Sequence, residues 1–265
     1  MISCVAVIQA RLGSTRLKNK VLADICGKPM LVRVIERVKM CKEINEVVVA
    51  FPDCDAGALS DLVIDAGASA CAGHLDPQDV LGRIYFAADL FKADVIVRVT
   101  ADCPLFDPGE VTTLLWTFKG HKTHIGFMNV DVPHRQDPSE WSIRDKRKNC
   151  FPEGLDCEVI TMRTLGLAQT SAVVHWDREH VTPWIYRQPN RFKSICAWPD
   201  KEDYAGLKWS VDTAADLEFA RAVYSDLGDS FVWRDVIALL NRKPELLEIN
   251  GQTWRPRRGV ALGPA

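Results

Sequence analysis

The stretch that decides the fold is Val5-Ala6-Val7-Ile8-Gln9-Ala10-Arg11-Leu12-Gly13-Ser14-Thr15-Arg16-Leu17-Lys18-Asn19-Lys20-Val21-Leu22. It begins as a short apolar run rich in β-branched residues, which predicts a buried strand. The run then breaks into a loop, where Gly13 lacks a Cβ and lets the backbone turn tightly and approach a ligand. Ser14 and Thr15 add hydroxyl groups. A strand that ends in a loop of this composition is a suitable cradle for a polyphosphate.

Positive charge is concentrated around this loop. The first 40 residues hold eight Lys and Arg against two acidic residues, whereas the whole chain has a formal net charge of −2. In the loop itself the cations are Arg11, Arg16, Lys18 and Lys20. One glycine with scattered cations is also typical of a solvated surface loop. The charge asymmetry favours an anion-binding site instead.

The same region carries a family resemblance. The pattern consists of Ile8-Gln9-Ala10-Arg11, Gly13-Ser14-Thr15-Arg16-Leu17, Lys20 and Gly27-Lys28-Pro29-Met30-Leu31. It resembles the nucleotide-binding opening of the cytidylyltransferases, which include the CMP-sugar-acid synthetases and the SpsF-like spore-coat polysaccharide proteins. The resemblance implies that the loop holds the triphosphate of CTP. The family often has Pro-Gly where this chain has Lys18-Asn19, so we expect a less rigid and more basic loop.

The resemblance also implies a set of residues that contact the nucleotide. These are Gln9, Ala10, Arg11, Gly13, Ser14, Arg16, Lys20, Thr100 and Ala101.

Composition excludes several other classes of protein. The chain has 265 residues, of which 47% are hydrophobic and 26% charged, as in ordinary globular domains. The near-neutral net charge argues against a nucleic-acid partner. No apolar run approaches the roughly 20 residues of a membrane span, and the N-terminus lacks a basic leader. Nine cysteines without a Cys-x-x-Cys motif are typical of reduced thiols, so we expect a cytoplasmic protein.

Apolar strands alternate with helical patterns along the first half of the chain. Strands are predicted at 46–51, 68–72 and 94–99, and helices at 29–38, 59–66 and 79–88. This alternation implies right-handed βαβ units and a parallel sheet. Together with the resemblance, it predicts one Rossmann-like three-layer α/β/α nucleotidyltransferase domain over 1–250, with a mostly parallel sheet. We further expect a small β insertion at about 120–155, an amphipathic helix over 231–248 and a disordered tail over 251–265.

Two aspartates are candidates for a magnesium site. Asp102 comes directly after the predicted strand that ends at Val99, and the carboxyl ends of parallel strands lie at the same edge of a sheet as the basic loop. Mg²⁺ prefers one or two carboxylates together with phosphate oxygens. The family's metal-binding aspartate lies in a similar Asp-x-Pro-Leu setting. The alternative is a turn or helix-capping role, which we favour for Asp107.

The second candidate is Asp212, in Leu207-Lys208-Trp209-Ser210-Val211-Asp212-Thr213-Ala214-Ala215-Asp216. We expect a strand that ends at Asp212, followed by a helix that Thr213 caps. The resemblance places the family's second metal-binding aspartate here. Helix capping alone is the other interpretation, and it suits Asp216 better.

Two later segments provide candidates for binding the acceptor substrate. Asp156 and Glu158 alternate on one face of a predicted strand and either orient acceptor hydroxyls or lie solvated on an edge strand. Arg178 and His180 belong to a segment with the SpsF-like pattern. An arginine fork suits an anionic group because it binds two oxygens at once, whereas a lone histidine is equally consistent with a structural role.

These observations lead to one functional hypothesis. The chain is identified as a member of a Mg²⁺-dependent cytidylyltransferase family, in which an oxygen of an anionic acceptor, such as a sugar acid, attacks the α-phosphorus of CTP and pyrophosphate leaves. Arg11, Arg16 and Lys20 would hold the phosphates, while Asp102 and Asp212 would hold the metal; the catalytic set is Arg11, Lys20, Asp102 and Asp212. The resemblance also implies a homodimer and a role in polysaccharide biosynthesis.

Two alternatives stay open. One is a nucleotidyltransferase of the same fold that acts on a phosphonate or phosphosugar. The other is a nucleotide-binding module without catalytic activity, against which the presence of both aspartates argues.

Overall fold

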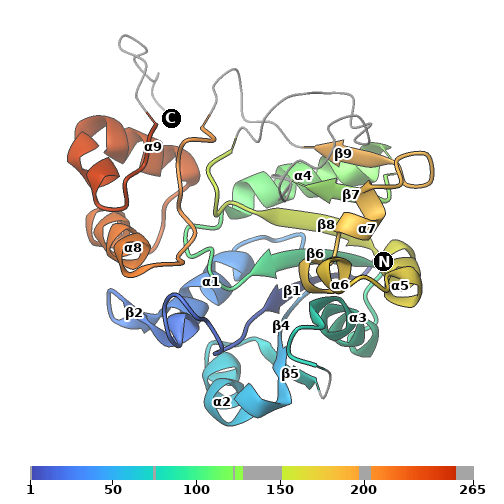
Figure 1. The fold of residues 1–265 in the computed structure, drawn as a ribbon. Helices are drawn as coiled ribbons and strands as arrows, with labels where there is room; N and C mark the ends of the chain where they lie inside the picture. Colours follow the sequence, from blue (N-terminus) through green and yellow to red (C-terminus); the bar gives the residue numbers. More distant parts are fainter. Residues whose placement is uncertain (1, 74–75, 122, 128–150, 197–203, 255–265) are drawn as a thin grey trace.

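The computed structural model describes residues 2–73, 76–121, 123–127, 151–196 and 204–254 (Figure 1). In these residues the main sheet has seven strands in the order β5-β4-β1-β6-β8-β7-β9. Their bounds are Cys4–Gln9 (β1), Glu46–Pro52 (β4), Ser69–Gly73 (β5), Val95–Thr100 (β6), Ile125–Phe127 (β7), Cys157–Thr161 (β8) and Ser194–Cys196 (β9). Only β8 runs antiparallel to its neighbours β6 and β7. The mostly parallel sheet predicted from the alternating pattern is therefore confirmed.

Helices cover both faces of this sheet. The first group is α1 (Met30–Lys39), α2 (Ala56–Asp65), α4 (Pro108–His121), α8 (Ala214–Leu227) and α9 (Trp233–Arg242). The second group is α3 (Val80–Leu90), α5 (Met162–Ser171), α6 (His175–His180) and α7 (Pro183–Tyr186). In Figure 1, α8 and α9 lie at the left and the second group at the right. The predicted three-layer α/β/α architecture is confirmed.

Strand β1 shows why the sheet separates two cores. Ala6 and Ile8 pack with the first group of helices, while Val5 and Val7 pack with the second, because successive side chains of a strand point to opposite faces. All four are fully buried. Full burial of one Val or Ile side chain contributes about 1.5–3 kcal/mol, so an apolar strand is stable only between two layers.

Short elements complete the described chain. They are the 3₁₀ helices η1 (Lys20–Leu22), η2 (Asp53–Asp55) and η3 (Pro244–Glu248) and the two-residue strands β2 (Asp24–Ile25) and β3 (Lys28–Pro29). Seven cysteines are free thiols, namely Cys4, Cys26, Cys41, Cys54, Cys71, Cys103 and Cys157. Among the described residues, no helix has both the length and the apolar character needed to cross a membrane.

Two predictions about the C-terminal third are wrong. Residues 207–212 do not form a strand, since among the described residues their one ladder contact is an isolated bridge between Glu153 and Lys208. The helix predicted over 231–248 ends at Arg242, and Pro244 opens η3 after it. Proline lacks the N–H that a continuing helix needs. Most of the predicted insertion (128–150) and the tail beyond 254 lie outside the described residues.

Candidate active site

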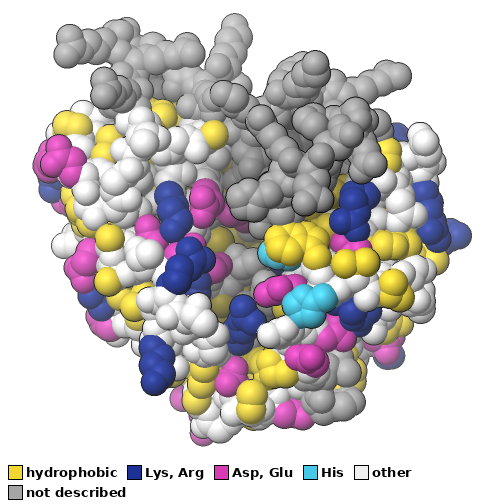
Figure 2. Space-filling model, in the orientation of Figure 1, with side chains coloured by type: hydrophobic (Ala, Val, Ile, Leu, Met, Phe, Trp, Pro, Cys, Tyr) yellow, Lys and Arg dark blue, Asp and Glu magenta, His cyan; other side chains and the backbone are white. Residues whose placement is uncertain are grey.

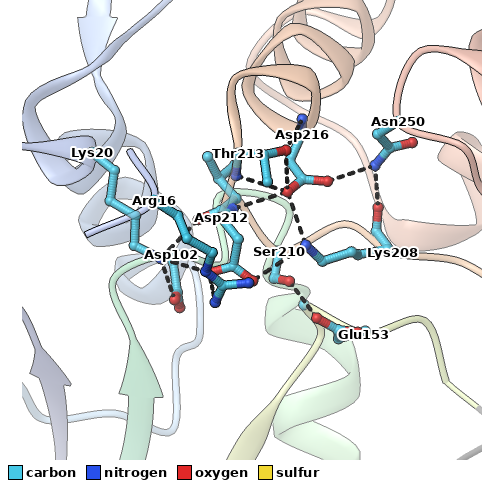
Figure 3. A network of polar contacts seen from close by, with 12 residues as sticks. Arg16, Lys20, Asp102, Glu153, Lys208, Ser210, Asp212, Thr213, Asp216 and Asn250 are labelled. Carbon is cyan, nitrogen blue, oxygen red and sulfur yellow. Dashed lines mark hydrogen bonds and ion pairs between the residues drawn. The ribbon is translucent and has the colours of Figure 1, made fainter. Parts of the chain in front are cut away.

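Lys20 lies where three distant parts of the chain meet. Its Nζ donates to Asp102 Oδ2 at 2.8 Å, to Asp212 Oδ1 at 3.0 Å and to the Val211 carbonyl at 2.8 Å (Figure 3). Asp102 follows the end of β6, and Asp212 immediately precedes the cap of α8. The sheet edge thus brings together three of the residues predicted to form the catalytic centre.

Arg16 approaches the same carboxylate from the solvent side. Its Nη2 lies 3.0 Å from Asp212 Oδ1, yet 65% of the Arg16 side chain is exposed. An ion pair this exposed contributes about 0–1 kcal/mol. Arg16 can therefore exchange Asp212 for an anionic ligand at little cost in stability.

The backbone of the basic loop holds these cations in place. Asn19 adopts the left-handed conformation (φ 52°), which glycine takes readily and which asparagine tolerates better than most residues. The Asn19 carbonyl accepts from Leu22 N at 2.9 Å, and Leu12 N donates to Asp55 Oδ2 at 2.9 Å. Asparagine therefore allows this turn, and the exposed Lys18 adds to the positive charge of the loop.

A second lysine, Lys208, was not singled out from the sequence. Its Nζ lies 3.2 Å from Asp212 Oδ2 and 2.8 Å from Asp216 Oδ2 (Figure 3). Asp212 is therefore bonded by a different lysine at each oxygen. The signal that points to Lys208 is its period-two spacing with Ser210 and Asp212 in an extended segment, which puts alternate side chains on one side.

Asp216 anchors Lys208 from beneath. Only 4% of its side chain is exposed, and Oδ2 accepts from Thr213 N and Thr213 Oγ1, both at 2.9 Å. Asn250 Nδ2 donates to the other oxygen at 3.0 Å. Thr213 accepts in return from Asp216 N, which completes a capping box at the start of α8. The predicted capping roles of Thr213 and Asp216 are confirmed.

Their surroundings keep Lys20, Asp212 and Asp216 in their ionised forms. Burial lowers the pKa of Lys20, but Asp102 and Asp212 outweigh it, so the pKa lies above its ordinary value. Burial raises the pKa of Asp212, but Lys20 and Lys208 shift it further in the other direction, below its ordinary value. For Asp216, burial is likewise outweighed by hydrogen bonds, chiefly from Lys208, and the pKa falls to about 2. At neutral pH the site is an array of alternating fixed charges.

Asp107 has the capping role predicted for it. Its Oδ1 accepts from Gly109 N at 2.8 Å and Glu110 N at 3.1 Å, at the start of α4. Its Oδ2 accepts from Trp233 N at 2.6 Å. With both oxygens bonded and 2% of the residue exposed, Asp107 joins two helices and is not available to a ligand.

The remaining nucleotide-contact candidates line the same sheet edge. Gln9 ends β1 beside Thr100 of β6, and Ala101 N donates to the Gln9 carbonyl at 3.1 Å. At Gly13 an added Cβ would meet no atom within 4 Å, so this residue borders open space. Arg11 is 44% exposed and lies 3.9 Å from Glu179. Ala10 is buried directly after β1, and Ser14 is half-buried in the loop. Contacts of these residues with a nucleotide stay predictions.

Two of the acceptor candidates already have partners within the protein. Arg178 Nη2 donates to Asp79 Oδ2 at 2.7 Å and Gln169 Oε1 at 2.9 Å, and its Nη1 donates to the Ala172 carbonyl at 3.0 Å. These contacts connect α6 to α3 and α5. The ring of His180 packs on that of Trp176, with their centroids 3.7 Å apart. Arg178 thus holds helices together, and its predicted contact with an acceptor is untested.

The other two acceptor candidates differ in their surroundings. Asp156 accepts from Gly154 N at 2.8 Å in the turn before β8. Glu158 is buried, and its two oxygens accept from Arg98 Nη1 and from Thr182 Oγ1. Glu158 is therefore not a solvated residue of an edge strand, since β8 lies between β6 and β7. The predicted roles of Asp156 and Glu158 in acceptor binding stay untested.

The surface of this face is hollowed at its centre. Figure 2 shows Lys and Arg side chains (dark blue) beside Asp and Glu side chains (magenta) around the hollow, with a histidine (cyan) at its right-hand side. A concave surface with convergent charged groups is typical of a binding site for a small charged molecule.

The fold and the site define an enzyme of the nucleotidyltransferase type, with a mostly parallel sheet that gathers cations and carboxylates at one edge. The family model described as cytidylyltransferase matches residues 5–226. The chain therefore belongs to the cytidylyltransferase family, and the enzyme class predicted from its sequence is confirmed.

Individual relatives support this assignment. An uncharacterized protein of Methanocaldococcus jannaschii is 30% identical over 254 residues, which cover 93% of each chain. The 3-deoxy-manno-octulosonate cytidylyltransferase of Rhizobium etli is 29% identical over 83% of this chain and 94% of its own. The structure of a cytidylyltransferase from Leptospira borgpetersenii matches with a TM-score of 0.81 at 25% identity, over 97% of this chain and 100% of that one.

A more distant solved structure shares the fold. It is a CMP:2-keto-3-deoxy-manno-octonic acid synthetase complexed with CTP, with a TM-score of 0.59 at 21% identity over 84% of this chain and 99% of that one.

Proposed function

We propose that this enzyme transfers CMP from CTP to an anionic acceptor, in a Mg²⁺-dependent reaction that releases pyrophosphate. The observation that carries the proposal is the convergence of Arg16, Lys20, Asp102 and Asp212 at one edge of the sheet. Cations for phosphates and carboxylates for a metal are the groups that phosphoryl and nucleotidyl transfer need in one place.

The names of the relatives support the choice of substrates. The relative from Rhizobium etli is named for 3-deoxy-manno-octulosonate, which is a sugar acid, and one structure of the same fold contains CTP. An anionic acceptor also agrees with the exposed cations Arg11 and Arg16 of the basic loop.

The donor atoms of the site fit a magnesium ion. The Asp102 and Asp212 oxygens and the Val211 carbonyl all lie within 3.0 Å of one point, which the Lys20 ammonium takes in this structure. These are hard oxygen donors, as Mg²⁺ prefers. No group of three or more His, Cys, Asp and Glu side chains with metal-binding geometry occurs in the described residues, so phosphate and water oxygens would complete the coordination.

Each protein group has a separate task in the proposed reaction. Mg²⁺ would supply charge neutralisation to the reacting phosphate. Arg16 and Lys20 would bind the phosphates and stabilise the charge that develops on the leaving pyrophosphate. Lys208 would stay on Asp212 and Asp216 and keep the carboxylate of Asp212 oriented. The described site gains its rate from positioning and charge rather than from a covalent intermediate.

A pyrophosphate-release screen tests the proposal. CTP is offered with Mg²⁺ and one acceptor from each of three groups: sugar acids, phosphonates and phosphosugars. Release with a sugar acid supports the proposal, whereas release only with a phosphonate or phosphosugar supports the alternative acceptor. No release with any acceptor, with CTP still bound, would indicate a binding module. The dimer, the cytoplasmic location and the role in polysaccharide biosynthesis stay predictions.

A further inference from the structure

A chain of polar contacts crosses three strands beside the catalytic cluster. Arg98 of β6 donates from Nε to Gln9 Oε1 at 2.9 Å and from Nη1 to Glu158 Oε2. Thr182, between α6 and α7, donates to Glu158 Oε1 at 2.5 Å. The strand register sets this arrangement, because Arg98 is paired with Val7 of β1 and with Glu158 of β8.

The chemistry of Arg98 fixes how the Gln9 amide lies. A guanidinium has only donors, so the amide must turn its oxygen towards Arg98. The NH₂ group of Gln9 then points away from Arg98. Glu158 accepts from Arg98 at one oxygen and from Thr182 at the other, and 11% of its side chain is exposed. It therefore holds the Arg98 guanidinium in one orientation.

Two donors of this chain have no partner. Within the described residues, no hydrogen bond involves Gln9 Nε2 or Arg98 Nη2. The fully buried side-chain nitrogens that lack a partner in these same residues belong to Arg37, Arg83 and Trp209. The unpaired nitrogens of Gln9 and Arg98 are not among them, so each keeps some solvent-accessible surface.

The two donors lie near the edge of the sheet that also carries the Lys20 cluster. Gln9 ends β1, directly before the basic loop, and Arg98 lies two residues before the end of the neighbouring strand β6. Glu158 already accepts at both of its oxygens and Gln9 accepts at its amide oxygen, so what the pair offers to a ligand is two donor nitrogens. A carboxylate suits two such donors because its two oxygens accept at the same time and its charge makes both hydrogen bonds stronger than those to a neutral hydroxyl group.

We propose that Gln9 and Arg98 form a donor pair that binds the carboxylate of the acceptor, with Glu158 as the positioning residue that orients Arg98. This inference rests on the proposed function, since it assigns the anionic group of the acceptor to named atoms. It gives Gln9 a role towards the acceptor in place of the nucleotide contact expected from the sequence, and it gives Arg98 the anion-binding role expected of Arg178.

The decisive variant is Gln9→Glu. A carboxylate at this position still accepts from Arg98 and keeps the shape of the side chain, but it replaces the NH₂ donor with an oxygen that repels an anionic acceptor. We expect an unchanged melting temperature, a rise of at least tenfold in KM for the sugar acid 3-deoxy-manno-octulosonate and a change below threefold in KM for CTP. Gln9→Met removes the NH₂ donor without adding a negative charge, so it separates the loss of the hydrogen bond from charge repulsion. It should raise KM for the sugar acid about threefold to tenfold.

Arg98 is tested without leaving a buried charge. Arg98→Met alone would strand Glu158 and endanger folding, so it is combined with Glu158→Leu, since an apolar pair often replaces a buried ion pair without loss of stability. The double variant should bind CTP normally and lose at least tenfold in kcat/KM for the sugar acid. A second acceptor for comparison is the same sugar with its carboxylate reduced to a primary alcohol. The ratio of kcat/KM for the sugar acid to kcat/KM for this alcohol should fall by a similar factor in the double variant. Arg221→Met, which removes an exposed arginine of α8, is the matched control.

The outcomes separate this inference from the proposed function. A parent enzyme that releases no pyrophosphate with any acceptor overturns both. If the parent is active and the Gln9 and Arg98 variants keep the parent's KM for the acceptor, the donor pair alone is wrong. The donor pair is also wrong if the variants raise KM for CTP and not for the acceptor. It is likewise wrong if Gln9→Met leaves KM for the acceptor unchanged and only Gln9→Glu raises it, since charge repulsion alone would then explain the weaker binding.

Discussion

The Lys20 ammonium donates to Asp212 Oδ1 at 3.0 Å, although the two residues are 192 positions apart in the chain. The same nitrogen donates to Asp102 at 2.8 Å. A lysine therefore lies between the two carboxylates that we assign to the metal. In the proposed reaction, Lys20 would leave the two carboxylates when a metal ion binds and would then contact the phosphates. Binding of the metal ion and of the nucleotide would therefore be coupled.

Lys20→Met should reduce catalytic efficiency by tenfold or more. A hydrogen bond to a charged group contributes about 1.5–3 kcal/mol, and losing it in the transition state lowers kcat/KM accordingly. Steady-state pyrophosphate release measures the effect, with Lys18→Met as the control because Lys18 is an exposed lysine of the same loop. If the Lys20 variant has wild-type kinetics, Lys20 has only a structural role and does not take part in catalysis.

The same Lys20→Met change should strengthen divalent-cation binding in the absence of nucleotide. Removing the ammonium leaves the carboxylates of Asp102 and Asp212 facing one another, and a metal ion then relieves their repulsion without displacing a competitor. Titration with Mn²⁺, followed by electron paramagnetic resonance, measures this without turnover. An affinity equal to or weaker than that of the parent would show that Lys20 does not compete for the cation position.

Asp102→Asn and Asp212→Asn should each abolish turnover. Asparagine keeps the shape and one acceptor oxygen but removes the charge that a hard cation prefers. CTP can still bind through the arginines, so the defect should appear in kcat more than in KM. Kinetics across a Mg²⁺ titration provide the measurement, and circular dichroism checks the fold. If a variant turns over at close to the parental rate at the same Mg²⁺ concentration, the mutated aspartate does not bind the metal and has only a structural role.

Asp216 should contribute to stability in a pH-dependent way. Its folded pKa of about 2 lies below the unfolded value near 3.9, so its contribution is complete above about pH 4 and is lost as the pH falls towards 2. After allowance for solvent screening, we expect about 1–2 kcal/mol at pH 7. Urea unfolding of the parent and of Asp216→Asn at several pH values tests this. Equal pH slopes below pH 4 for the two proteins would contradict it.

CTP should stabilise the protein more than ATP, GTP or UTP. The expectation follows from membership of the cytidylyltransferase family and from the basic loop of β1. Thermal-shift titrations with each nucleotide and Mg²⁺ compare the four. Equal stabilisation by all four nucleotides would indicate a site that binds the phosphates without selecting the cytosine base.

Local sequence rules accounted for much of the fold. The apolar runs of β1, β4 and β6 were recognisable as strands because parallel strands are buried on both faces. The caps at Asp107 and Thr213 were also predictable, since a cap bonds backbone groups two or three residues away. Where the local rule was misread, at Pro244 and over 207–212, the predicted element was wrong.

The sequence by itself therefore determined the strands, the caps and, through the resemblance of the basic loop, the cytidylyltransferase family. Only the tertiary structure decided which charges meet. Lys20 lies between Asp102 and Asp212, Lys208 lies on Asp212, and Arg178 is bonded to Asp79. Strand and helix signals are short-range, because they depend on hydrogen bonds and burial along one segment. The partner of a charged side chain instead depends on the sheet register and helix packing that bring distant segments together, and no spacing in the sequence encodes that distance.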